Sequence, residues 1–327
     1  MKALTMVQAI NHALAMEMRL DRDIIVYGED VGISGGVFRA TDLLQKEFGR
    51  KRCFDAPLAE SGIAGTAIGM AIAGLKPVIE MQFSGFAWPA FDQLITHAAR
   101  FRNRTRGAMS CPMVVRMPYG GGIRALEHHV ESMEATWAHI PGLKVVIPST
   151  PYDAAGLLIA AIRDPDPVIF MEPKRVYRAF KQEVPIEAYT LPIGRARVIQ
   201  AGSDITLVGY GAMMRELTLA THQLEELGIR AELIDLRTIY PYDADTIYQS
   251  VKKTGRLLVV HEGPKSFGVG AELVAQVTKC CFTSLLAPPT RLTGSDTIFP
   301  LPKGEDLYMI SSSEIVQQAA DLVKFIP

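Results

Sequence analysis

Glu60 is the residue whose position most clearly suggests chemistry. It stands in the segment 54–65, and a run of small and apolar residues follows at 66–74. That run predicts a closely packed, buried helix with the carboxylate at its mouth. A carboxylate in such a place is hard to solvate, so its pKa should rise, which suits proton exchange with a bound base. The alternative is an acid that only stabilises the positive end of the helix.

Aromatic and histidine side chains form a second candidate group. Residues 83–88 place several aromatic rings at the end of a predicted strand, either as core or as a platform for a planar heterocycle. His128 and His129 follow the glycine loop 120–122, and adjacent residues in an extended loop point apart. One functional histidine is therefore favoured over a pair that binds one metal ion. With Glu60, the aromatic segment predicts a pocket for an aminopyrimidine, which would stack on the rings and bond the carboxyl group.

The segments that position these residues alternate between strands and helices. Thr5 predicts the cap of a helix over 6–19, and the buried strand 24–28 ends just before Glu29. Open α/β sheets bind ligands beyond the carboxyl ends of their strands, which is where Glu29 should lie. Further strands are expected at 77–83, 112–118, 143–148 and 168–172, and helices at 89–104 and 152–163.

A second series of the same kind follows a break. Residues 177–201 carry mixed charge and two prolines without a helical period, and we interpret 186–200 as an ordered linker. Beyond it, strands are expected at 205–209, 231–236, 256–261 and 288–292, and helices near 213–227, 243–252 and 268–280. The sequence thus predicts an α/β protein with two doubly wound domains, residues 1–185 and 201–327.

Composition excludes several classes of function. The net charge is -1, with 34 basic and 35 acidic residues, so no global field recruits nucleic acid or an anionic membrane. The four cysteines lack zinc spacing, no long apolar stretch predicts a membrane span, and no signal peptide is evident, which together favour a cytoplasmic protein. The phosphate-binding P-loop and a Gly-Asp-Gly diphosphate motif are both missing, and the glycines at 268–270 make a poor dinucleotide fingerprint.

The sequence closely resembles, over essentially its whole length, the β subunit of the thiamine-diphosphate-dependent E1 component of 2-oxoacid dehydrogenase complexes. This resemblance implies a transketolase-like pyrimidine-binding domain followed by a domain like the transketolase C-terminal domain. The matching motifs lie at 27–32 (YGEDVG), 35–38 (GGVF), 57–62 (PLAESG), 91–93 (FDQ), 141–146 (PGLKVV), 148–154 (PSTPYDA), 156–158 (GLL), 235–238 (DLRT) and 253–256 (KTGR).

The resemblance implies roles for individual residues. Glu60 matches the acid that bonds N1′ of the cofactor's aminopyrimidine and favours the tautomer that removes the proton from C2. Phe86 matches the aromatic ring under the pyrimidine, and Leu58 a neighbouring apolar contact. Glu29 and Asp92 resemble acids that line a polar tunnel between the two active sites of a heterotetramer.

At the substrate and lipoyl end of the site, the resemblance points to His129, with Gln82 nearby. The family usually has serine after that histidine, whereas this chain has Val130, so a hydrogen bond that might orient the imidazole is in doubt. His128 becomes a rival for the same role.

The resemblance also implies ions and partners. The carbonyls of Ala161 and Asp164, with help from Asp166, match a structural potassium site, although a plain proline-flanked turn explains these residues equally well. An α subunit would supply the missing diphosphate site with its Mg²⁺, which makes this chain half of an α2β2 heterotetramer. The complex would also include an E2 acyltransferase core with its lipoyl domain, and the loop 263–268 is a candidate interface.

Short motifs at 139–142, 172–174 and 293–297 look more like members that act on branched-chain 2-oxo acids than like pyruvate members, and we lean towards a branched-chain substrate. The alternatives are a pyruvate or acetoin dehydrogenase β subunit, or a catalytically silent transketolase-like scaffold. A self-sufficient thiamine enzyme and a nicotinamide dehydrogenase are disfavoured because their cofactor motifs are missing.

Overall fold

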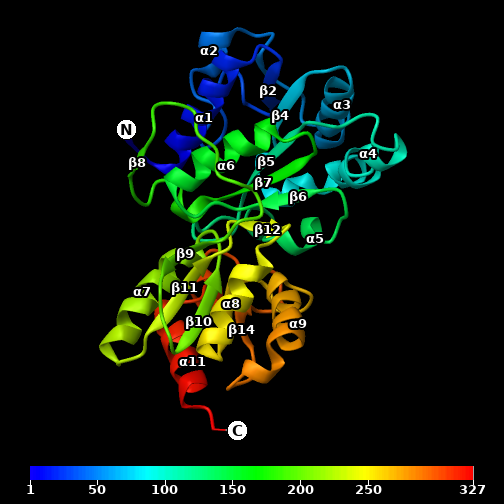
Figure 1. The fold of residues 1–327 in the computed structure, drawn as a ribbon. Helices are drawn as coiled ribbons and strands as arrows, with labels where there is room; N and C mark the ends of the chain where they lie inside the picture. Colours follow the sequence, from blue (N-terminus) through cyan, green and yellow to red (C-terminus); the bar gives the residue numbers. More distant parts are fainter. Residues whose placement is uncertain (327) are drawn as a thin grey trace.

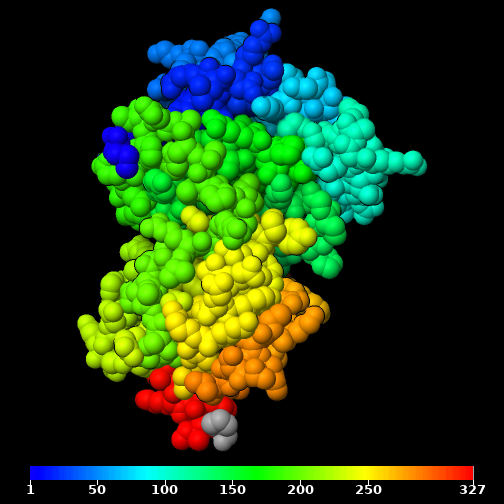
Figure 2. All heavy atoms as spheres, viewed as in Figure 1, coloured from blue at the N-terminus to red at the C-terminus, as the bar shows by residue number. Residues whose placement is uncertain are grey.

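The computed structural model describes residues 1–326, which form two stacked α/β bodies (Figure 1). Figure 2 shows the first body, blue to green, above the second, yellow-green to red, with the red C-terminal segment farthest from the N-terminal half. Within residues 1–326, no helix is both long enough and apolar enough to cross a membrane.

A seven-stranded sheet forms the centre of the first body. Its strand order is β12-β6-β7-β5-β4-β2-β3, and every neighbouring pair is parallel except β12 with β6. The strands of the sheet from this half of the chain are β2 (Ile24–Gly28), β3 (Cys53–Asp55), β4 (Lys76–Glu80), β5 (Val114–Tyr119), β6 (Lys144–Val146) and β7 (Val168–Pro173). Their side chains are buried almost throughout because helices cover both faces.

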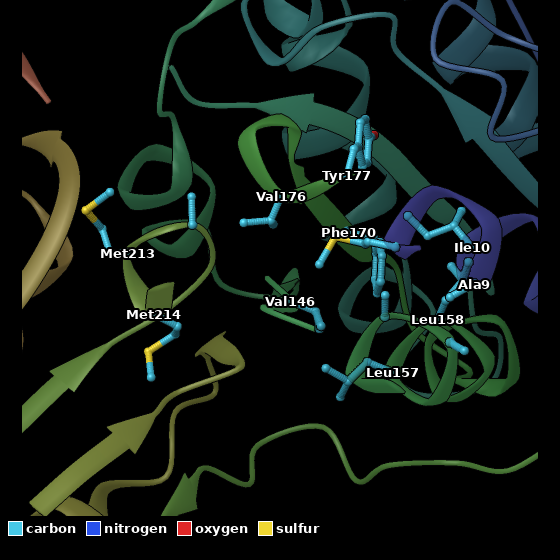
Figure 3. Close-up of a cluster of buried hydrophobic side chains, with 14 of the residues drawn as sticks. Ala9, Ile10, Val146, Leu157, Leu158, Phe170, Val176, Tyr177, Met213 and Met214 are labelled. Carbon is cyan, nitrogen blue, oxygen red and sulfur yellow. The ribbon is translucent and has the colours of Figure 1, made fainter. Parts of the chain in front are cut away.

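Alternate residues of these strands enter two different hydrophobic clusters, one on each face. On one face, α1 (Met6–Leu20) packs against α6 (Pro151–Arg163), and Arg163 bonds Glu17 at 2.7 Å. Figure 3 shows this cluster, in which Ile10 of α1 and Leu157 of α6 join Phe170 of β7. Met213 and Met214 of the second body belong to the same cluster, so the two bodies share a core.

The opposite face of the sheet carries a second set of helical elements. They are α3 (Glu60–Ile72), the 3-10 helix η1 (Ser84–Ala90), the π-helix η2 (Gln93–Ala98), α4 (Phe101–Arg104), the 3-10 helix η3 (Glu127–His129) and α5 (Glu134–Ala138). The remaining elements of this half are β1 (Lys2–Leu4), α2 (Leu44–Phe48), the 3-10 helix η4 (Lys174–Val176) and β8 (Gln182–Val184).

A five-stranded sheet of order β14-β13-β10-β11-β9 forms the second body, and only β9 is antiparallel to its neighbour. Its elements are β9 (Arg197–Gln200), β10 (Ile205–Gly209), α7 (Met213–Glu226), β11 (Ala231–Asp235), α8 (Ala244–Thr254), β13 (Leu257–Pro264), α9 (Val269–Cys281), the 3-10 helix η5 (Phe282–Ser284), β14 (Thr290–Gly294), α10 (Glu305–Tyr308) and α11 (Ser312–Lys324). Two α/β bodies with mainly parallel sheets confirm the predicted fold class.

The connection between the bodies differs from a simple linker. β8 pairs with β1, and β9, inside the segment 186–200, pairs with β11 of the second sheet. The strand β12 (Thr238–Tyr240), which follows β11, crosses back to pair with β6 of the first sheet. Such pairings were not predicted, because a three-residue edge strand leaves no periodic signal in the sequence. The domain limits 1–185 and 201–327 stay a prediction.

The helix expected over 89–104 is broken into three parts of different pitch. Pro89 lies inside η1, the next turns form the π-helix η2, and only α4 is regular. Proline removes a backbone donor and clashes with the preceding turn, which accounts for the irregular start. The single continuous helix that we expected over 89–104 is therefore wrong.

Candidate active site

The candidate residues gather along the carboxyl edge of the first sheet. Glu29 follows β2, Glu60 follows β3 and begins α3, and Gln82 follows β4. Because these strands are parallel and adjacent, their carboxyl ends meet at one edge. The loop after β2 is fixed to β3, since the Asp55 carboxylate accepts the backbone N–H groups of Gly32 at 2.7 Å and Ile33 at 3.2 Å.

Glu29 is the perturbed acid of this edge. Its side chain is buried, and within residues 1–326 neither carboxylate oxygen has a hydrogen-bond partner. Burial, and then the negative charges of Glu60 and Asp30, raise the pKa of Glu29 to about 7. The acid is therefore divided between its two protonation states near neutral pH, and it responds to the charge of Glu60.

Glu60 lies in a more open place than the sequence suggested. Its helix α3 buries only one face, through Ile63, Ala64, Ala67, Ile68 and Ala71. The opposite face, which includes Gly62 and Thr66, is exposed, and Glu60 itself is half-buried. The prediction of a buried helix is thus wrong for one of its two faces. Small residues permit close packing, but they do not show whether the packing partner belongs to the same chain. At this edge of the sheet, Glu29 is the buried acid.

Two aromatic rings and two imidazoles cluster beside these acids. The Phe83 ring centroid lies 5.2 Å from that of Phe86, and His129 contacts both, at 4.7 and 5.0 Å. Phe86 also lies 5.3 Å from His128, and the Lys174 ammonium lies 5.6 Å from the Phe83 centroid. The predicted aromatic platform is therefore a real cluster with an imidazole at its edge.

The two histidines have different surroundings. The His129 Nδ1 atom is buried and has no hydrogen-bond partner within residues 1–326. His128 is exposed, and its Nδ1 lies 3.5 Å from the Glu131 carboxylate, which also accepts the indole N–H of Trp88 at 3.0 Å. Val130 points into the core with no exposed surface. Glu131 was not predicted as a site residue, although its spacing of three from His128 matches one helical turn.

The remaining site residues are less closely joined. The Gln82 amide donates to Asp30 at 3.1 Å, which places Gln82 beside the Glu29 loop. The Asp92 carboxylate accepts a hydrogen bond from the Thr96 hydroxyl at 2.9 Å, at the start of η2. Asp92 and Glu60 are not hydrogen-bonded to each other. Leu58 is 80% exposed, so its apolar side chain is available to another chain or a ligand.

The turn proposed for potassium has its carboxylates already engaged. The Asp164 carboxylate binds the Lys144 ammonium at 2.6 Å, and the Asp166 carboxylate binds the Arg102 guanidinium at 2.6 Å. The Ala161 carbonyl accepts the Asp164 N–H at 3.3 Å. Residues 1–326 contain no group of three or more His, Cys, Asp or Glu side chains that could hold a metal ion. A potassium site made of backbone carbonyls stays a prediction.

A buried ionic cluster lies on the central strands of the same sheet. Arg116 of β5 donates to Glu80 of β4 at 2.7 Å and to Glu172 of β7 at 2.7 Å, and all three are buried. Gly36 in the loop after β2 approaches this cluster so closely that a side-chain carbon there would lie 3.0 Å from Glu80 Oε1. Glu172 and Lys174 belong to a motif that suggested a branched-chain substrate. In the structure, both side chains contact other residues of the buried interior.

Comparisons with known proteins agree with this geometry. Residues 2–179 match the family model of the transketolase pyrimidine-binding domain, and residues 194–315 match that of the transketolase C-terminal domain. The chain is 54% identical to the pyruvate dehydrogenase E1 component subunit beta of Acholeplasma laidlawii, covering all of both chains. It is 50% identical to the protein of that name from Mycoplasma pneumoniae, covering 97% of each, and 48% identical to that from Staphylococcus epidermidis, covering 99% of this chain.

A solved structure shows the same fold at greater distance. The chain superposes on a split-gene transketolase, described as an inactive β4 tetramer, with a TM-score of 0.80 and 20% identity, covering 98% of each chain. At that identity the likeness concerns the fold alone. The branched-chain preference finds no support among these relatives, which carry the name of pyruvate dehydrogenase.

Proposed function

The chain belongs to the transketolase-like β subunits of the E1 components of 2-oxoacid dehydrogenase complexes, and we propose that it serves a pyruvate-type complex. With an α subunit it would catalyse the thiamine-diphosphate-dependent oxidative decarboxylation of pyruvate and the reductive acylation of the lipoyl group on E2. The observation that carries the proposal is the pair Glu29 and Glu60, a buried acid without partners beside a half-buried acid at a helix start.

The residues at this edge fit an aminopyrimidine. Glu60 offers a carboxyl group for a ring nitrogen, Phe86 offers a half-buried aromatic face, and the Glu29 oxygens still have unused hydrogen-bonding capacity. When bound, thiamine diphosphate supplies a nucleophilic thiazolium carbon and an electron sink for decarboxylation. Because this chain lacks the glycine motif for a diphosphate, we assign that end and its Mg²⁺ to the α subunit.

Proton movement is the task of this chain's own acids. Glu60 would hold a proton at the pyrimidine N1′ atom, and the charge on Glu60 in turn sets how readily Glu29 gives up its proton. Glu29 and Asp92 would continue that path towards a second active site in an α2β2 tetramer. The exposed face of α3 means that the partner must exclude water from Glu60, so the chain alone should be inactive.

The histidines would act at the substrate end. His129 presents an unpartnered Nδ1 beside Phe86, which suits a hydrogen bond to the 2-oxo acid or to the arriving lipoyl group. His128 is instead oriented by Glu131 and lies outside the ring cluster's buried side. We therefore assign the substrate role to His129 and keep His128 as the rival to be tested. Gln82 would add a polar contact at the edge of the site, and Leu58 would add an apolar one.

The deciding experiment uses the chain alone and the chain assembled with its α partner. Thiamine diphosphate binding and dye-linked decarboxylation are measured with pyruvate and with 2-oxoisovalerate. We expect activity only in the assembly and a preference for pyruvate of about tenfold or more, the size of discrimination that added methylene groups allow. Activity of the chain alone would refute the half-site assignment, and a preference for 2-oxoisovalerate would restore the branched-chain interpretation. Inactivity of the assembly towards both would favour a silent scaffold.

Two smaller proposals have separate measurements. If the carbonyls of the turn at 161–166 hold potassium, replacing Na⁺ by K⁺ should raise the melting temperature, because a ligand that binds only the folded state stabilises it. Equal melting temperatures in the two salts would contradict a potassium site at this turn. Cytoplasmic location stays a prediction, which cell fractionation tests.

A further inference from the structure

The loop that carries the two histidines reaches from the first body to the second. It is the segment 120–132, which we call the histidine loop; it follows β5 and carries His128 and His129 within η3. Its centre, residues 122–128, is mostly exposed. An exposed segment has few contacts of its own, so the contacts at the ends of the loop decide where His129 lies.

Glu262 of β13, in the second body, binds both ends of the histidine loop. Its Oε1 atom accepts the Gly121 backbone N–H at 2.6 Å and the Ser132 hydroxyl at 3.2 Å. The Glu262 side chain is buried, and a hydrogen bond to a buried carboxylate is stronger than one between neutral groups. One carboxylate of the second body therefore closes a loop of the first.

Glu305, at the start of α10, holds the centre of the histidine loop. Both oxygens of its buried carboxylate accept the Arg124 backbone N–H, at 3.1 and 3.3 Å. The Arg124 side chain adds an exposed ion pair with Asp306 at 2.9 Å. The beginning, the centre and the end of the loop are thus all bound by acids of the second body.

Two glycines make this close contact between the bodies possible. Gly120 has a φ of +81°, and a side-chain carbon there would overlap the Glu262 carboxylate. A side-chain carbon on Gly121 would lie 2.5 Å from the Phe299 ring and 2.9 Å from the Met309 sulfur, both in the second body. Larger residues at these positions would therefore push the loop away from the second body.

Lys174 connects the same two acids to the ring cluster of the active site. Burial lowers the pKa of Lys174 to about 7, and the charges of Glu262 and Glu305 act in the opposite direction. The Lys174 ammonium also lies 5.6 Å from the centroid of the Phe83 ring, which His129 contacts at 4.7 Å. The two acids thus lie close to both the histidine loop and the rings against which His129 packs.

We propose that Glu262 is a positioning residue for His129. By closing the histidine loop on the second body, it holds the imidazole beside Phe86, where the substrate or the lipoyl group would arrive. The second body thereby contributes to catalysis without touching the reacting atoms. The catalytic consequence rests on the proposed function, whereas closure of the loop is a property of the isolated chain and is measured without activity.

Hydrogen–deuterium exchange of the full-length chain, followed by mass spectrometry of peptides from the histidine loop, measures this closure. Glu262→Ala removes the acceptor and should speed exchange in the loop by about tenfold or more, whereas Glu262→Gln keeps an acceptor oxygen and should stay within about threefold of wild type. Glu232→Ala is the matched control, because Glu232 is a buried acid of the second sheet that accepts the Gly202 backbone N–H at 3.2 Å. It should leave exchange in the histidine loop unchanged.

Two results of this measurement would overturn the proposal. Unchanged exchange in Glu262→Ala would mean that contacts within the first body suffice, such as the hydrogen bond from the Ser84 hydroxyl to the Glu131 carbonyl at 2.6 Å. Equally fast exchange in the alanine and glutamine variants would mean that an acceptor oxygen is not what closes the loop.

Kinetics of the assembled enzyme distinguish positioning from general damage. With the α partner, pyruvate and a lipoyl domain, Glu262→Ala should lower kcat for reductive acylation by about tenfold to 100-fold, as expected when a reacting group is displaced. Exchange of the thiamine C2 proton, which we assign to Glu60, should stay at the wild-type rate. An equal fall in both rates would overturn the proposal, and so would faster loop exchange with unchanged acylation.

A second variant covers the case in which Glu262→Ala does not assemble. Ser132→Ala removes one of the two donors to Glu262 and should speed loop exchange and slow acylation by about threefold each. No change in either rate overturns the proposal. An inactive wild-type assembly would instead refute the proposed function, and loop exchange in the isolated chain would still decide whether Glu262 closes the loop.

Discussion

Replacing Glu29 by glutamine should make the stability of the chain less dependent on pH. Glutamine has the shape of a protonated glutamic acid but cannot ionise. In the wild-type chain the pKa of Glu29 is raised from 4.5 to about 7, mainly by burial and then by Glu60 and Asp30. The folded state therefore holds this proton more tightly than the unfolded chain does.

The sign and size of the effect follow from linkage. Between pH 4.5 and about 7 the unfolded chain loses the proton first, so this group lowers the free energy of unfolding as the pH rises. At about 1.4 kcal/mol for each pH unit, the loss above pH 7 is at most about 3.5 kcal/mol. Glu29→Gln removes that loss. Between pH 4.5 and pH 8, the free energy of unfolding of the variant should therefore rise relative to that of wild type by up to about 3 kcal/mol.

The assay is urea unfolding of the isolated chain at pH 5, 6, 7 and 8, with wild type, Glu29→Gln and Glu187→Gln side by side. Glu187 is exposed, so its variant controls for the loss of one negative charge. The control should follow wild type at every pH. A difference between Glu29→Gln and wild type that stays constant from pH 5 to pH 8 would show that Glu29 ionises normally, and the reasoning about its burial would fail.

Two further changes test the surroundings of the site. Glu131→Ala should lower kcat/KM of the assembled enzyme and shift the Trp88 fluorescence. The free energy of unfolding should change by less than about 1 kcal/mol, because the contact between Glu131 and His128 is partly exposed. Unchanged kinetics would show that Glu131 does not position His128. Arg116→Met should destabilise the chain by about 3–5 kcal/mol, because it leaves two buried carboxylates unpaired. Replacing both Glu80 and Glu172 by glutamine in the Arg116→Met variant should restore much of the lost stability, measured by thermal melting. If stability is not restored, the arginine contributes by packing.

The sequence predicted those features that depend on local pattern. Buried runs such as residues 24–28 and 205–209 identified strands, and the order of strands and helices identified two α/β bodies. The aromatic rings at 83–88 together with Glu60 pointed to an aminopyrimidine site, which stays a prediction, and the structure brings Phe86 and His129 together. The inferences about strands and fold class succeed because period, residue type and position after a parallel strand are all local quantities.

Other features depend on contacts between distant segments. Burial raises the pKa of Glu29, and the sequence did not reveal that burial because it depends on the packing of segments that are far apart in the chain. The pairing of β12 with β6 joins segments far apart in the chain and has no local signature. The branched-chain motifs find no support among the relatives. Two of their residues have structural contacts instead: Glu172 bonds Arg116 in the core, and the Lys174 ammonium lies 5.6 Å from the Phe83 ring centroid.

We expect Glu60 to promote proton exchange at the thiamine carbon once an α subunit has closed the site. The direct measurement is the rate at which the C2 proton of bound thiamine diphosphate exchanges with deuterium, followed by NMR after acid quenching, in wild-type and Glu60→Gln assemblies. Glu60→Gln should slow exchange by about 100-fold or more, the usual contribution of a positioned acid–base group, while cofactor binding and the tetramer persist. Exchange at the wild-type rate in a variant that still binds the cofactor would contradict it.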